Sequence, residues 1–121
     1  IWVPVEPGPT FEDTRVWVEK VSRAVGAMVP DLVSWAWGTK ERKGLARLDY
    51  TQNAVNKTLV APYSVRAAIG APVSMPISWD ELDDPDLRPD GWSIATAPQR
   101  IAEVGDLFAP VLTGAQRLPD L

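Results

Sequence analysis

The chain has 121 residues, a length suited to one domain with a single modest core, and a formal net charge of -4. It contains no His and no Cys, which excludes disulfides, the usual zinc sites, a Cys nucleophile and a His base. Any metal must therefore be held by oxygen ligands, which favours hard ions such as Mg2+ or Mn2+.

The N-terminal segment predicts a short strand followed by a long helix. Residues 1–5 alternate like a strand, and a Pro-Gly-Pro sequence ends it. Thr10 then suits an N-cap, with Asp13 three residues later, and Pro30 ends the helical pattern. Apolar or small residues recur at steps of three and four, which predicts a helix over residues 11–28: Phe11, Thr14, Val18, Val21, Val25 and Met28. We expect this face to pack on the core; a membrane or partner surface is the alternative.

A β-rich segment follows at residues 32–37, and a charged turn joins it to a second predicted strand at residues 44–50. We predict that they pair as a hairpin. In the second strand, Leu45, Arg47 and Asp49 share one face, because side chains alternate along a strand. Residues 52–57 are expected to form a loop, after which the chain stays extended to about Arg66.

Shorter elements are predicted for the rest of the chain. Residues 73–77 suit an edge strand, since Pro76 cannot donate to a ladder, and residues 92–94 a brief strand. Ser78 is expected to cap a short helix over 79–82, with Glu81 at the capping-box position. Thr96 is expected to begin a helix that ends at Gly105, and a last helical segment to cover about 106–112.

Opposite charges are concentrated in different segments. Residues 40–66 carry six basic residues against two acids, whereas residues 78–90 carry six acids against one Arg. One end of the domain can therefore be locally positive and attract phosphates although the whole chain is acidic. The alternative is two solvated surfaces of opposite sign, without a binding role.

Asp49 is the main candidate for a site residue, because Asp is a poor strand former yet lies within an apolar, aromatic stretch. The alternative is a surface Asp paired with Arg47. We expect Arg42, Gln52 and Arg66 to converge on Asp49 if the strands end at one sheet edge. Guanidinium groups suit phosphate oxygens, and a carboxylate beside them suits a metal that bridges those oxygens.

Other motifs indicate less. The Asp84-Pro85-Asp86 sequence superficially resembles a metal doublet, but it lies in a Pro-containing loop, and a solvated loop explains it better. The six Trp residues can include a base-stacking platform, although packing in the core and at its rim accounts for most of them. The Walker loop, the Rossmann fingerprint and the G-x-S-x-G elbow are absent.

The sequence GLARLDYTQNAVNKTLVAPYSVR, continued by GAPVSMPISWDEL, closely resembles the C-terminal half of bacterial primase-polymerases. These belong to the archaeo-eukaryotic primase superfamily and include the polymerase domain of non-homologous end-joining DNA ligases and its stand-alone relatives. The resemblance covers nearly the whole chain and is densest from Arg42 to Leu82. It implies a nucleotidyltransferase that adds ribo- or deoxyribonucleotides to a primer at gaps and broken ends.

The resemblance also implies roles for individual residues. Asp49 matches the third catalytic acid and metal ligand of the family, and Arg42, Gln52 and Arg66 match residues that contact the incoming nucleotide. Mn2+ or Mg2+ is the implied cofactor. The family's paired Asp-x-Asp ligands and its phosphate-binding Ser motif precede this segment. Since the chain begins with Ile, we expect residues 1–121 to be the C-terminal part of a longer domain, inactive alone.

The sequence therefore predicts an α+β fold, with an antiparallel-rich sheet flanked by helices, as the catalytic-palm half of a primase-like polymerase. The expected partners are gapped or broken DNA, NTP or dNTP, an ATP-dependent DNA ligase and the end-binding Ku protein. No apolar segment approaches the roughly 20 residues that cross a bilayer, so we expect no membrane association and a location in the bacterial cytoplasm. The rival interpretations are a non-catalytic nucleic-acid or protein-binding module, and a structural subunit that completes another chain's sheet.

Overall fold

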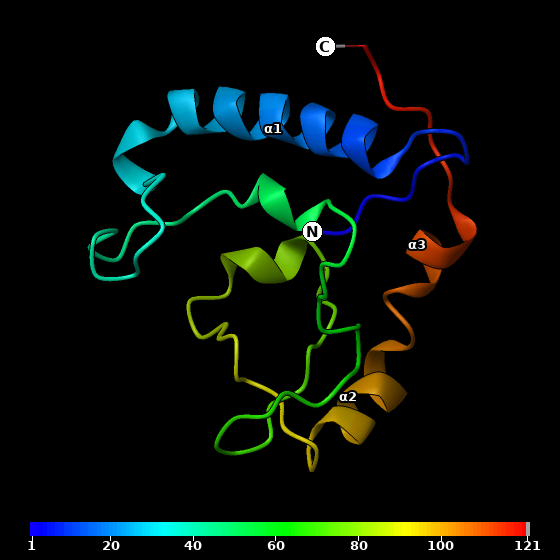
Figure 1. The fold of residues 1–121 in the computed structure, drawn as a ribbon. Helices are drawn as coiled ribbons and strands as arrows, with labels where there is room; N and C mark the ends of the chain where they lie inside the picture. Colours follow the sequence, from blue (N-terminus) through cyan, green and yellow to red (C-terminus); the bar gives the residue numbers. More distant parts are fainter. Residues whose placement is uncertain (121) are drawn as a thin grey trace. The chain divides into compact units, whose positions relative to one another are not determined.

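The computed structural model describes residues 1–120, and Figure 1 shows their path. The helices are α1 (Phe11–Met28), α2 (Ala97–Val104) and α3 (Ala109–Thr113). Short 3-10 helices are η1 (Pro30–Leu32), η2 (Tyr50–Gln52) and η3 (Asp80–Asp83). The chain divides into two compact units: a first unit of Ile1–Val5 with Leu59–Arg117, and a second unit of Glu6–Thr58 with Leu118–Leu121.

Helix α1 has the predicted bounds because its end signals are local. The Thr10 hydroxyl accepts a hydrogen bond from the Asp13 amide at 3.2 Å, and the Asp13 carboxylate accepts one from the Thr10 amide at 2.8 Å. This capping box satisfies amides that the first helical turn leaves unpaired. The expected core-facing stripe is wrong for Phe11, Val25 and Met28, which are exposed.

The packed side of α1 is instead centred on Gly26, its one buried residue. A Cβ atom at this position would lie 2.7 Å from Cζ2 of Trp35, so glycine is what allows the indole to approach the helix. The Arg23 guanidinium lies over the same indole, 4.1 Å from its centroid, and donates a hydrogen bond to the Tyr50 hydroxyl at 3.4 Å. These contacts pack η2 beside α1 (Figure 1).

The expected sheet is largely absent from the part of the chain that the structure describes. Isolated bridges, and no extended ladders, join residues 1–120: Val5 with Gln116, Val33 with Ala46, Val65 with Val73, and Pro72 with Ser93. The antiparallel-rich prediction is therefore not confirmed. Twelve prolines and several residues with positive φ keep turning the chain, which leaves few consecutive residues able to pair.

The predicted hairpin of residues 32–37 and 44–50 is also wrong. Ala46 donates its amide to the Leu32 carbonyl at 2.9 Å and accepts from the Ser34 amide at 2.8 Å, which is the parallel pattern. The turn between them contains two residues with positive φ, Lys43 (51°) and Gly44 (86°). After this turn the second segment runs parallel to the first. The second segment does not continue as a strand to residue 50, because Asp49 begins η2.

The first unit has a small buried centre at Pro72, Val73 and Ala97. Helix α2 begins and ends where predicted, at Thr96 and at Gly105 with φ 75°. The short helix before it is η3, whose N-cap is Trp79 and not the predicted Ser78. Half of the predicted capping box is present, because the Glu81 carboxylate accepts the Ser78 amide at 2.7 Å, but the Ser78 hydroxyl donates to the same carboxylate instead of accepting a backbone amide. Glu81 also pairs with Arg100 of α2.

Two aromatic residues of this unit, Trp2 and Tyr63, contact the segment that leads into α3. The Trp2 and Phe108 rings meet edge to face, with centroids 5.7 Å apart. The Tyr63 hydroxyl donates to Asp106 at 2.6 Å, which anchors the loop before α3. Among residues 1–120, no helix combines the length and apolar character that a membrane span requires.

Candidate functional site

Asp49 occupies the N-cap of η2 in the second unit, rather than the middle of a strand. Its Oδ1 atom accepts hydrogen bonds from the Thr51 hydroxyl at 2.5 Å and from the Thr51 amide at 3.2 Å. An acidic side chain that caps its own chain two residues on is a common turn arrangement. The Asp-x-Thr spacing was the sequence signal for this contact, and our sequence analysis missed Thr51.

Gln52 lies close to Asp49, and its side chain makes a hydrogen bond directly to the Asp49 carboxylate. The Gln52 amide nitrogen donates to Asp49 Oδ2 at 3.2 Å, and its side chain is exposed. Arg47 Nε lies 3.9 Å from Asp49 Oδ1, beyond hydrogen-bond distance. The pairing with Arg47 that we gave as the alternative reading therefore exists as a longer-range ion pair beside the other contacts.

These contacts hold the pKa of Asp49 below its usual value. The Thr51 hydroxyl is the largest cause, partial burial opposes it, and Gln52, the Thr51 amide and Arg47 lower the pKa further. Donors and cations favour the charged form of a carboxylate. Asp49 is therefore ionised at neutral pH, which is the form that ligates a metal.

Arg42 and Arg66 are placed in different units. Arg42 lies in the turn before Asp49, where its amide donates to the Gly38 carbonyl at 3.3 Å, and its half-buried side chain forms no ion pair within residues 1–120. Arg66 lies in the first unit, where its amide donates to the Pro72 carbonyl at 2.8 Å and its side chain is exposed. The convergence of both arginines on Asp49 stays a prediction.

Arg47 connects Asp49 to an exposed aromatic residue. Its side chain is 9% exposed, its Nη1 donates to the Trp35 carbonyl at 3.1 Å, and its guanidinium lies 3.5 Å from the centroid of the Trp37 ring. Its Nε atom is buried and donates no hydrogen bond to any described residue. The guanidinium is thus fixed in orientation between the Trp37 ring and the Asp49 carboxylate.

The side chains around Asp49 can fill one ligand position of a hard metal ion, but they do not form a complete metal site. Asp49 offers carboxylate oxygens of the kind that Mg2+ and Mn2+ prefer. Within residues 1–120, no group of three or more acidic side chains is arranged to hold a metal. Asp84 and Asp86, the superficial doublet, lie in an exposed loop where the Asp84 carboxylate accepts the Asp86 amide at 2.9 Å.

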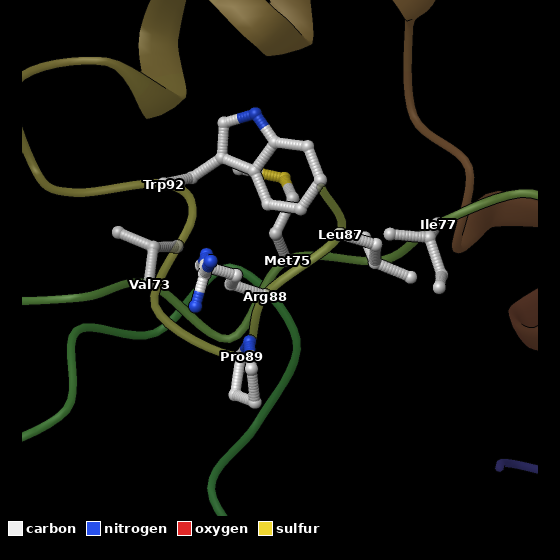
Figure 2. A pocket seen from close by; sticks show the side chains of 7 residues that line it. All are labelled: Val73, Met75, Ile77, Leu87, Arg88, Pro89 and Trp92. Atoms are coloured by element: carbon white, nitrogen blue, oxygen red, sulfur yellow. The ribbon is translucent and has the colours of Figure 1, made fainter. Parts of the chain in front are cut away.

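The first unit contains a separate pocket of about 330 Å3 (Figure 2). Figure 2 shows Trp92 at one end and Pro89 at the other, with Arg88 between them. The remaining lining residues are apolar: Val73, Met75, Ile77 and Leu87. Because its lining offers no carboxylate, hydroxyl or amide side chain, this pocket lacks the groups that general-base chemistry or metal binding requires.

Comparisons with known proteins agree on one family. The sequence model described as "LigD, primase-polymerase domain" matches residues 1–108. The multifunctional non-homologous end joining protein LigD of Mycolicibacterium smegmatis is 32% identical over 92% of this chain, and that of Pseudomonas aeruginosa is 31% identical over 84%. The chain spans 14% and 12% of these two relatives.

A solved structure gives the same result. The polymerase domain of Mycobacterium tuberculosis ligase D, in complex with DNA, superposes with a TM-score of 0.82 at 32% sequence identity. The match covers 93% of this chain and 39% of that one. The fold described above is therefore part of a primase-like polymerase fold, although the described residues contain little sheet.

Proposed function

Because this chain belongs to the LigD primase-polymerase domain family, we propose that it supplies part of the active site of a metal-dependent nucleotidyltransferase. The reaction is transfer from an NTP or dNTP to a primer 3'-hydroxyl, during gap filling and end-joining repair of DNA. The relatives at 30–33% identity are named as non-homologous end joining proteins, and the structural neighbour binds DNA, which supports both the process and the substrate.

The observation that carries the proposal is the set of contacts around Asp49. Thr51 and Gln52 hold an ionised carboxylate by three hydrogen bonds, and Arg47 adds a cation at 3.9 Å. A carboxylate that is already ionised can ligate a metal without first releasing a proton, which favours Asp49 as a ligand.

In this proposal each residue has a defined part. Asp49 ligates the metal and orients the primer 3'-hydroxyl, while Arg42 and Arg66 neutralise charge on the triphosphate. Gln52 fixes the Asp49 carboxylate and contacts the nucleotide from its exposed position. A bound Mn2+ or Mg2+ ion would polarise the phosphate and bring the attacking and leaving oxygens into line.

The remaining metal ligands must come from further polypeptide, since one carboxylate cannot hold two metals. The exposed apolar surface supports this. Among residues 1–120, Gly26, Pro72, Val73 and Ala97 are the buried ones, while many large apolar side chains are exposed. A monomeric soluble protein seldom leaves so much apolar surface uncovered, so we propose that a segment carrying the other carboxylates packs against it.

The decisive experiment is primer extension on gapped DNA with Mn2+, using the complete polymerase domain that contains this chain. Asp49→Asn keeps the size of the side chain but removes its charge, and we expect a loss of at least about 100-fold in kcat. Asp31→Asn, an exposed acid of the same unit, is the matched control and should retain activity. Wild-type activity of Asp49→Asn, or extension by the 121-residue chain alone, would refute the assignment.

A further inference from the structure

Trp37 presents one open aromatic face. The Arg47 guanidinium covers the other face, 3.5 Å from the ring centroid, yet Trp37 is 72% exposed. The Arg47 side chain, which is 9% exposed, fills the space beneath the ring, so the indole cannot fold back onto the unit there. The ring is therefore held as a rigid, uncovered platform rather than as part of a core.

The segment around this platform is basic. Residues 38–47 carry four cations and one carboxylate: Lys40, Arg42, Lys43 and Arg47 against Glu41. Lys40 and Lys43 are exposed, and neither forms an ion pair with a described residue. The hydrogen bond from the Arg42 amide to the Gly38 carbonyl closes this turn directly beside Trp37. Unpaired cations next to a bare aromatic face suit a ligand that has both phosphates and planar rings.

Trp79 provides the contrast within the same chain. It is equally exposed, at 73%, but the segment over residues 78–90 carries six acids and one Arg. A phosphate-bearing ligand would be repelled there. Apolar exposure is thus common to both tryptophans, and the sign of the surrounding charge distinguishes them.

We infer that Trp37, backed by Arg47 and flanked by Lys40 and Lys43, is a stacking site for one base of a single-stranded nucleic acid. This inference rests on the proposed function, since it assigns the DNA strand to a surface of the same unit. Arg47 spans the distance between the two sites: its guanidinium stacks on Trp37, and its Nε lies 3.9 Å from Asp49 Oδ1. A base on Trp37 therefore holds the unpaired strand one side chain away from the candidate catalytic carboxylate.

The test is the fluorescence anisotropy of a fluorescein-labelled oligothymidylate titrated with the full chain. Loss of one base–aromatic stack predicts that Trp37→Ala binds roughly 5- to 150-fold more weakly than wild type. Trp79→Ala is the matched control and should change Kd less than about twofold. Wild-type affinity of Trp37→Ala, or an equal loss in Trp79→Ala, overturns the inference.

Two further measurements separate stacking from charge and from misfolding. Trp37→Ala should leave the slope of log Kd against log salt unchanged, whereas Lys40→Ala should reduce it by about 0.7, because it removes a phosphate contact. Trp37→Tyr should bind like wild type and Trp37→Leu like Trp37→Ala, with the same far-UV circular dichroism. Equal binding by the Tyr and Leu variants would overturn the inference, since leucine cannot stack.

The failure of this inference is distinguishable from failure of the proposed function. Asp49→Asn should abolish nucleotide transfer in the complete domain while the chain keeps its oligonucleotide affinity. If Asp49→Asn is inactive but Trp37→Ala binds normally, the stacking site alone is refuted. If Trp37→Ala binds weakly but Asp49→Asn transfers nucleotides normally, the catalytic assignment alone is refuted.

Discussion

Gly26 links the packing of α1 to the candidate site, which makes Gly26→Ala an informative substitution. The added Cβ would lie 2.7 Å from Cζ2 of Trp35, whereas carbon atoms pack at about 3.5–4.0 Å. The indole must therefore move by roughly 1 Å. Such overpacking costs about 1–3 kcal/mol, and displacing the ring also weakens the Arg23 contact, by about 0.5–1 kcal/mol.

The better helix propensity of alanine offsets about 0.8–1.0 kcal/mol of that cost. We therefore expect Gly26→Ala to lower the free energy of unfolding by about 0.5–3 kcal/mol, and Tm by about 2–12 °C, in thermal denaturation of the full chain. Because the Trp35 carbonyl accepts from Arg47, oligonucleotide binding should weaken too. Ala27→Gly, at an exposed position of the same helix, measures the propensity term separately.

A double-mutant cycle tests whether the clash between the added Cβ and Trp35 causes the loss of stability. In a Trp35→Leu background the ring atoms near Gly26 are gone, so Gly26→Ala should become neutral or stabilising. A rise in Tm on Gly26→Ala in the wild-type background would refute the reasoning. The same cost in both backgrounds would also refute it, because the cost would then not come from Trp35.

Two further substitutions test the polar contacts. Thr51→Val removes the hydroxyl that donates to Asp49 at 2.5 Å, and it should lower transfer activity of the complete domain about 10- to 100-fold. Thr51→Ser keeps the hydroxyl and should retain the activity. Equal activity of the Val and Ser variants would exclude this supporting role. The Ser78 amide, and then Arg100, hold the pKa of Glu81 below 4.5, so the charged form stabilises the fold above that pH and the contribution is lost as pH falls through the lowered pKa. Glu81→Gln should therefore cost about 1 kcal/mol in urea denaturation near pH 7, and the cost should shrink steadily as the pH is lowered below 4.5. A deficit independent of pH would contradict the assignment.

The helices were predictable because their signals are local. Thr10, Asp13 and Pro30 determine where α1 begins and ends, and Thr96 and Gly105 do so for α2. The buried side of α1 was not predictable in the same way. The apolar period favoured Phe11 and Met28, whereas the structure packs Gly26, whose role depends on a tryptophan nine positions later in the sequence.

The sheet prediction was less successful because a strand needs a second segment to pair with, and the strand's own sequence does not specify that segment. The segment before Asp49 was expected to be a strand, yet it pairs at Ala46 alone, and in the parallel sense. Left-handed conformations at Lys43 and Tyr63, which are unusual for residues with side chains, redirect the chain; the neighbouring Gly44 and Pro62 indicate a turn but not its geometry. The α+β prediction was thus correct for its helices and too generous in its strands.

The roles of the candidate site residues stay a prediction, and only part of their contacts could be foreseen. Asp49 was chosen because an acid is out of place in an apolar segment. The hydrogen bond of Gln52 to Asp49 and the stacking of Arg47 on Trp37 depend on where η2 turns the backbone. The cap at Asp49 has a local signal in the Asp-x-Thr spacing, whereas the stacking of Arg47 on Trp37 depends on how two separate segments pack.

The capping role of Asp49 has a consequence for metal loading. A carboxylate offers about four lone-pair positions, and Thr51 and Gln52 already occupy three of them. A cation that takes two positions must displace at least one of these donors, and the Thr51 amide is the one that belongs to the backbone of η2. Displacing this amide would open the first turn of η2, whereas displacing the Thr51 hydroxyl or Gln52 would not, and the rate of deuterium uptake at the Thr51 amide on cation binding distinguishes the two outcomes.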